Sequence, residues 1–162
     1  MFLRALVKST VGTCAVFTFF DVVGHPAQVI GNSMYPTLQA NDSRWYKRDF
    51  VWLSTWSLQK CSPGVILTFV SPRDSSSTHI KRLSAVEGQL VRPEKHPEML
   101  VPKGHYWMEG DNPVNRHDSN VYGPVPIALV KGRATHIIWP PNRWQALRNS
   151  NSNSSSVFID NE

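Results

Sequence analysis

The sequence predicts a mainly β domain preceded by a single apolar N-terminal helix. The first observation is the spacing of proline and glycine: 12 prolines and 9 glycines in 162 residues interrupt the chain too often for a helical bundle. The second is a series of short runs rich in β-branched and aromatic residues, separated by turn sequences. The third is that 41% of the residues are apolar and 18% are charged, which supplies a core and excludes global disorder.

The apolar N-terminal segment predicts a membrane anchor. Residues 9–20 carry no charge and are mostly apolar, with Lys8 before them and Asp21 after them. This run is shorter than the roughly 20 residues that a membrane-spanning helix needs, but it extends to about residues 3–23 if Lys8 reaches the interface. We therefore predict an uncleaved anchor over residues 1–24. A cleavable signal peptide fits less well because no small-residue cleavage site follows, and a buried core helix is the remaining alternative.

Residues 25–148 are predicted to fold as one β-rich domain. Turn sequences such as 62–64 and 110–113 separate the predicted strands. The predicted strands are the runs 50–53, 65–70, 78–83, 105–108 and 134–139. The C-terminal segment 149–162 is predicted to be disordered, because every residue from 149 to 156 is asparagine or serine.

Charge and cysteine content narrow the classes of function. The net charge is +5, and the basic residues are scattered without the runs that follow a phosphate backbone, so nucleic acid is not an expected partner. The surplus predicts a solvated basic surface, with attraction to anionic lipid headgroups as the functional alternative. Cys14 and Cys61 cannot form a multi-bridge framework, and no C-x-x-C or H-x-x-x-H pair is present. Neither a metal nor another cofactor is therefore expected.

The first candidate for chemistry is Ser33, which lies shortly after the predicted anchor. It follows Gly31 and Asn32 and precedes Met34. A serine hydroxyl is a weak nucleophile until a neighbouring base removes its proton. Backbone N–H groups in a turn can hold a developing oxyanion. By itself this sequence is also typical of an ordinary turn.

The second candidate is Lys81, within a predicted strand. Alternation along a strand places Lys81 on one face with Leu83 and Ala85. Apolar neighbours deprive the amine of hydration and lower its pKa. To act as a base near neutrality the pKa must fall by about 3 units, a differential cost of roughly 4 kcal/mol. A buried site can impose this cost, whereas a solvated strand lysine keeps its ordinary pKa.

The third candidate is a pair of polar loop blocks. Asp111 lies in Gly-Asp-Asn at 110–112, and Asp118 and Ser119 lie in Asp-Ser-Asn at 118–120. Such side chains cap turns and accept hydrogen bonds from backbone amides. Alone, these blocks predict a loop held by structural carboxylates.

Taken together and in this order, the three blocks resemble the signal peptidase I family of Ser/Lys membrane proteases. The motifs are Ser-Met-x-Pro-Thr from residue 33, Lys-Arg from residue 81, Gly-Asp-Asn from residue 110 and Tyr-Gly-Pro from residue 122. The likeness covers most of 25–139. Within the family it is strongest to the mitochondrial inner membrane members, which the segment 134–141 also resembles.

The resemblance implies a LexA-type, mainly β catalytic domain that needs no cofactor. It implies that Ser33 is the nucleophile and Lys81 the general base. It assigns Gly31, Asn32 and Met34 to the oxyanion hole and substrate cleft. Supporting roles fall to Asp111, Asp118 and Ser119.

The resemblance also implies a location and partners. It implies a single-pass protein of the mitochondrial inner membrane, with the catalytic domain in the intermembrane space. The substrates would be precursor proteins that carry hydrophobic sorting or signal peptides. A subunit 1-like protein would form a heterodimer with the chain, and the lipid bilayer would hold the anchor.

Three positions depart from the common pattern of the family. Gly31 stands where members often have a serine, Arg116 where many have a serine that orients the lysine, and Asn120 where many have an arginine. These departures support an alternative, a catalytically degenerate subunit that serves as a scaffold or binding module. A LexA-type self-cleaving repressor is a third possibility, but it predicts a helix-turn-helix before residue 30, where the apolar segment lies.

Overall fold

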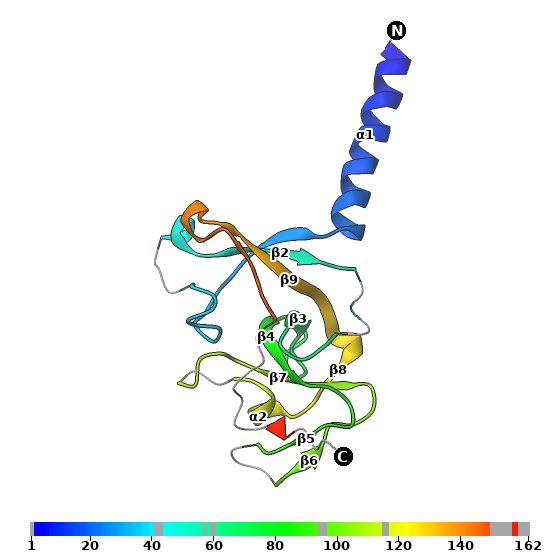
Figure 1. Ribbon diagram of the computed structural model, residues 1–162. Coiled ribbons are helices and arrows are strands. Elements are labelled where there is room, and N and C mark those ends of the chain that lie inside the picture. The colour runs from blue at the N-terminus through cyan, green and yellow to red at the C-terminus, as the bar shows by residue number, and fades with distance from the viewer. Residues whose placement is uncertain are drawn as a thin grey trace.

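A long helix and a β-rich body are the two parts of the molecule in the computed structural model. The structure describes residues 2–40, 44–56, 58, 61–93, 97–114, 117–149 and 157–158. Figure 1 shows helix α1 (Phe2–Val22) projecting from one end of the body. The prediction of a mainly β fold is confirmed.

Helix α1 covers the segment predicted as an anchor, and its described apolar side chains stay largely outside the β body. Phe17, for example, is 69% exposed. The end of α1 is fixed by Thr55, whose hydroxyl donates hydrogen bonds to the carbonyls of Asp21 (3.2 Å) and Val22 (2.8 Å). Within the described ranges, no helix combines the length and the apolar character needed to cross a membrane. The predicted transmembrane anchor is therefore not confirmed.

The body is built around an antiparallel sheet whose two halves are joined by one strand, β9 (Val130–Trp139). The C-terminal part of β9 pairs with β2 (Phe50–Ser54), and its N-terminal part pairs with β3 (Ile66–Val70). The order along the sheet is β1-β2-β9-β3-β4-β7-β8, and β10 also pairs with β9. The remaining strands are β1 (His25–Gln28), β4 (Thr78–Ala85), β7 (His105–Glu109), β8 (Val125–Pro126) and β10 (Gln145–Ala146). The five predicted strand runs fall in β2, β3, β4, β7 and β9 and are confirmed.

Shorter elements complete the fold, and the sequence did not predict them. A second sheet of three strands contains β11 (Val157–Phe158), β5 (Leu90–Val91) and β6 (Met99–Leu100). The short helices are η1 (Trp45–Lys47), α2 (Ser119–Tyr122), η2 (Ile127–Leu129) and η3 (Pro141–Arg143). Apart from residue 149 and β11, the segment predicted as a disordered tail lies outside the described residues.

Two buried clusters support the two sides of the candidate site. In the first, Met34 and Leu38, from the turn that carries Ser33, pack with Val51 of β2 and Ile137 of β9. The second cluster joins β3, β4, β7 and β8 and includes Leu67, Phe69, Leu83, Met108 and Val125. Full burial of one such side chain contributes about 1.5–3 kcal/mol. Each side of the site is therefore held by its own core.

Candidate active site

Ser33 lies in a tight turn between β1 and η1. The N–H of Tyr35 donates to the carbonyl of Asn32 (3.2 Å), and the N–H of Leu38 donates to the carbonyl of Met34 (2.8 Å). Met34 and Leu38 are 1% and 0% exposed, so they fix the turn to the first core on both sides of Tyr35. The expectation that Met34 lines the cleft is not met, because its side chain packs beneath the turn instead. Ser33 itself stays at the surface of the pocket described below.

Lys81 lies in the middle of β4 and is buried. It is opposite Leu67 of β3 in the strand register, and it is 3% exposed. Burial lowers the pKa of its amine from 10.5 to about 8, and the carboxylates of Asp118 and Asp111 limit the fall. A base near neutrality requires a shift of this direction, and about half of the molecules carry a neutral amine near pH 8.

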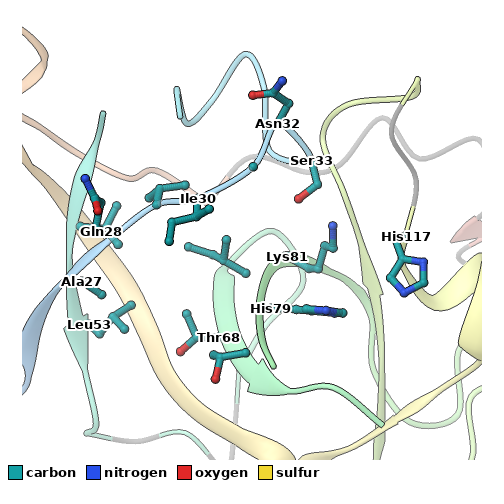
Figure 2. Close-up of a pocket in the computed structure, with 15 residues that line it drawn as sticks. Ala27, Gln28, Ile30, Asn32, Ser33, Leu53, Thr68, His79, Lys81 and His117 are labelled. Carbon is teal, nitrogen blue, oxygen red and sulfur yellow. The ribbon is translucent and has the colours of Figure 1, made fainter. Parts of the chain in front are cut away.

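Gly110 brings the turn of Ser33 and the side chain of Lys81 to the same place. A Cβ atom at Gly110 would lie 2.6 Å from the carbonyl oxygen of Ser33 and 3.5 Å from the Nζ atom of Lys81. Figure 2 shows the side chains of Ser33 and Lys81 pointing toward one another. In the described residues no hydrogen bond joins the two groups. Such catalytic contacts often form only when substrate binds.

The loop after β7 holds the Ser33 turn in position. The backbone N–H of Asn112 donates to the carbonyl of Ser33 (3.0 Å), and its side-chain amide donates to the carbonyl of Asn32 (2.9 Å). The Gly-Asp-Asn block predicted that its side chains would hold a turn through backbone groups. It did not show that Asn112 would bind the carbonyls of Asn32 and Ser33.

Arg82, the residue after Lys81, forms a buried clamp on the opposite face of β4. Its guanidinium donates two hydrogen bonds to Asp111, at 2.8 and 2.6 Å, and a third to the carbonyl of Gly64 (2.7 Å). The hydroxyl of Thr37 also donates to Asp111 (2.5 Å). Through Asp111, this clamp joins the Ser33 turn, β4 and the loop after β7.

Asp118 and Ser119 bind backbone groups next to the site. Asp118 is fully buried, caps helix α2 and accepts a hydrogen bond from the N–H of Gly110 (3.1 Å). The hydroxyl of Ser119 accepts from the N–H of Met108 (2.9 Å). Asn120 donates to both Asp118 (3.1 Å) and Glu109 (3.2 Å), so an amide occupies the place between these carboxylates. Arg116 lies outside the described residues.

A pocket of about 440 Å³ runs along the site, and Figure 2 shows the residues that line it. Four of the residues singled out in the sequence line it: Gly31, Asn32, Ser33 and Lys81. The rest of the wall is mixed. Apolar side chains from β1, β2 and β4 form one part of the wall, and polar ones from β3, β4 and the loop before α2 form another: Ala27, Val51, Leu53 and Ile80, then Thr68, Thr78, His79 and His117.

Two histidines, His79 and His117, line the pocket together with Lys81, and the sequence did not predict this. The rings of His79 and His117 lie 5.7 Å apart, and Tyr122 packs against both. Burial lowers the pKa of His79, with further contributions from the Lys81 and His117 charges. The described residues contain no group of three side chains suited to a metal ion.

Comparison with known proteins shows the family to which the chain belongs. The sequence pattern described as "Signal peptidase, peptidase S26" matches residues 3–97 and 92–139. The chain belongs to the signal peptidase family, peptidase S26. The matched residues include both sides of the pocket, so the resemblance seen in the three sequence blocks is confirmed.

Similar family members are named as mitochondrial inner membrane proteases. The chain is 42% identical to the mitochondrial inner membrane protease subunit 2 of Mus musculus over 80% of this chain and 75% of that protein. It is 32% identical to subunit 2 of Saccharomyces cerevisiae, over 88% of this chain and 84% of that protein. Subunit 1 of Mus musculus is 34% identical, over 85% of this chain and 82% of that protein. The chain therefore resembles both kinds of subunit.

Proposed function

We propose that the chain is a serine endopeptidase of the mitochondrial inner membrane that removes hydrophobic sorting or signal peptides from precursor proteins. Ser33 is the nucleophile and Lys81 the general base. The observation that carries the proposal is a desolvated amine held next to the Ser33 turn at Gly110, a position that leaves no room for a side chain.

The chemistry follows from these two groups. The neutral amine of Lys81 takes the proton of Ser33 while the hydroxyl oxygen attacks the scissile carbonyl. The backbone N–H of Ser33, with other N–H groups of the same turn, would donate to the developing oxyanion. The lysine then gives its proton to the leaving amine, which breaks the peptide bond. It next activates the water that hydrolyses the ester on Ser33.

The substrate is proposed to bind as an extended strand. β1 lies at the edge of the sheet, and its residues Ala27 and Gln28 line the pocket that leads to Ser33. Main-chain pairing along such an edge gives affinity, and pockets for alternate side chains give specificity. The apolar part of the wall suits the small apolar residues that precede the scissile bond.

The cellular setting is part of the same proposal. The relatives are named as subunits of an inner membrane protease, so we propose that this chain works with a subunit 1-like protein and faces the intermembrane space. We also propose residues 25–148 as the catalytic domain, between the N-terminal segment 1–24 and the tail 149–162.

The test is precursor processing by variants of the two groups. The chain is produced with its companion subunit, whose own nucleophile is replaced, and cleavage of an inner membrane precursor is measured. Ser33→Ala and Lys81→Met should fold and lose processing. Ser76→Ala and Lys131→Met, which change exposed residues of the same types, should retain it. Processing by either site variant would contradict the proposal.

A degenerate scaffold makes a different prediction. A mechanism-based acylating probe should label Ser33 in the wild-type chain, because the neutral lysine activates the hydroxyl. The label should be absent from Lys81→Met. A chain that binds its companion subunit but is never labelled would be a scaffold.

A further inference from the structure

Gly110 connects the carboxylate of Asp118 with the two groups of the proposed catalytic pair. Its backbone N–H donates to Asp118 (3.1 Å). A Cβ atom at Gly110 would lie 3.5 Å from the Nζ atom of Lys81 and 2.6 Å from the carbonyl oxygen of Ser33. Asp118 is fully buried, so water screens its charge little. A buried negative charge is therefore held next to the residue that lies against the amine of Lys81.

In the described residues, Asp118 is held by neutral donors. One is the N–H of Gly110, and the other two belong to Asn120, which donates from its backbone N–H (3.0 Å) and from its side-chain amide (3.1 Å). These hydrogen bonds satisfy the oxygens of Asp118 but bring no positive charge to cancel its own. The electrostatic field of Asp118 therefore remains to act on neighbouring groups.

The side chain of Asn120 lies between two buried carboxylates. Its amide also donates to Glu109 (3.2 Å), which accepts a further hydrogen bond from the indole N–H of Trp107 (3.1 Å). The amide oxygen of Asn120 is buried and has no hydrogen-bond partner among the described residues. An acceptor left unpaired costs stability, whereas a guanidinium has donors only and would pair with carboxylates. The neutral side chain at this position therefore decides the local charge.

The titratable and charged groups around Lys81 and Asp118 come from several elements. They are Asp111 in the loop after β7, His117 before α2, Tyr122 in α2, and His79 and Arg82 on β4. Opposite Lys81 on β3 stands the uncharged Leu67. Burial lowers the pKa of the Lys81 amine, and of the two carboxylates that oppose this, Asp118 acts more strongly than Asp111. The guanidinium of Arg82 offsets the charge of Asp111, so Asp118 is the carboxylate left to act on the amine.

We propose that Asn120 is a positioning residue, which sets the pH range of the proposed catalytic pair by leaving the charge of Asp118 to act on Lys81. This charge favours the ammonium that forms when Lys81 takes the proton of Ser33. The same attraction makes the amine a stronger base and moves its working range toward higher pH. Asn120 does not line the pocket and acts through Asp118. This inference rests on the proposed function, because it concerns Lys81 as the base.

The test is the pH dependence of the rate at which a mechanism-based acylating probe labels Ser33, measured on the chain with its companion subunit. The wild-type rate should rise with a midpoint near pH 8. Asn120→Arg places a cation between the two carboxylates, so the midpoint should fall by about 1 pH unit. Labelling on the high-pH plateau should become slower, because a base of lower pKa is intrinsically weaker.

Matched variants separate the charge of Asp118 from other effects. Val121→Lys adds a cation at the next residue, whose side chain is 39% exposed, and solvent screening should leave the midpoint unchanged. Asp118→Asn removes the charge with little change of shape, and its midpoint should fall as in Asn120→Arg. In the Asp118→Asn background, Asn120→Arg should shift the midpoint less than it does in the wild type, because no Asp118 charge is left to neutralise.

The outcomes distinguish this inference from the proposed function. A wild-type chain whose Ser33 is never labelled would contradict the proposed function, and this inference with it. If Ser33 is labelled but Asn120→Arg leaves the midpoint unchanged, or Val121→Lys moves it equally, Asn120 does not set the pH range. Thermal unfolding shows which variants fold. If Asn120→Arg does not fold, Asp118→Asn decides, and an unchanged midpoint in that variant would overturn the proposal.

Discussion

Lys81 and Arg82 are neighbours on β4. Both side chains are buried, but only the charge of Arg82 is paired directly with a carboxylate. They are 3% and 4% exposed, and they point to opposite faces of the strand. Arg82 is paired with Asp111 in a two-point ion pair. Lys81 has the carboxylates of Asp118 and Asp111 near enough to affect its pKa, but burial has the larger effect.

The difference shows how one strand can hold a structural charge and a reactive amine together. A buried guanidinium keeps its charge and must be satisfied by partners. A buried amine can instead give up its proton, which makes it a base. The clamp formed by Arg82 joins the loops that hold Ser33, so a paired charge organises the site in which we propose that the amine of Lys81 reacts.

Replacement of Lys81 by arginine should give the largest effect. Lys81→Arg retains the positive charge but removes the ability to lose a proton near neutral pH. Cleavage in single-turnover assays should fall about 100- to 10,000-fold, the usual contribution of a general base. For the wild type, kcat/KM should rise with pH through about 8, as Lys81 loses its proton. An arginine variant that retains a tenth of the activity would show that Lys81 is not the base.

The clamp on the other face should matter for stability. Asp111→Asn leaves the buried guanidinium of Arg82 without its counter-charge and should lower the free energy of unfolding by about 3–5 kcal/mol. The matched control is Glu98→Gln, which breaks the exposed ion pair between Arg92 and Glu98. That change should cost less than about 1 kcal/mol. Urea unfolding measures both, and equal losses would show that Arg82 does not depend on Asp111.

The sequence predicted that residues far apart along the chain would meet in one place. Ser33 and Lys81 line one pocket, as the three sequence blocks implied. The strand runs were also predictable, because alternation and turn residues are local signals. The sequence also predicted the helical segment α1. Among the described residues, however, no helix is both long and apolar enough to confirm the membrane anchor.

The sequence could not predict the parts of the site that depend on tertiary contacts. Met34 is next to Ser33, yet the turn directs it into the core. Arg82 could be read as a surface residue until the fold placed Asp111 beside it. His117 reaches the pocket only because the loop before α2 folds back toward β4. None of these contacts leaves a periodic signal in the sequence.

The cost of burying Lys81 should be visible in the pH dependence of stability. Its pKa is lower in the folded chain than in the unfolded one, so the unfolded state binds more protons between about pH 8 and 10.5. Stability of the wild type should therefore rise in this window, relative to Lys81→Met, by about 3 kcal/mol. The measurement is urea unfolding of both proteins at pH 7 and pH 10. If the free energy of unfolding changes equally in both proteins between pH 7 and pH 10, the amine of Lys81 is solvated in the folded chain.

The smallest expected effect comes from a change at Gly110, which lies against both the Ser33 turn and the side chain of Lys81. Gly110→Ala places a Cβ atom 2.6 Å from the carbonyl of Ser33 and 3.5 Å from the Lys81 Nζ atom, so the Ser33 turn must move. A shift of about 1 Å in a reacting group can cost on the order of 100-fold in rate, and the crowding about 1–3 kcal/mol in stability. Gly12→Ala is the control, because a Cβ there meets nothing within 4 Å. If Gly110→Ala cleaves as fast as Gly12→Ala, the Ser33 turn and Lys81 do not need this close approach. The alignment of nucleophile and base would then have to come from the substrate.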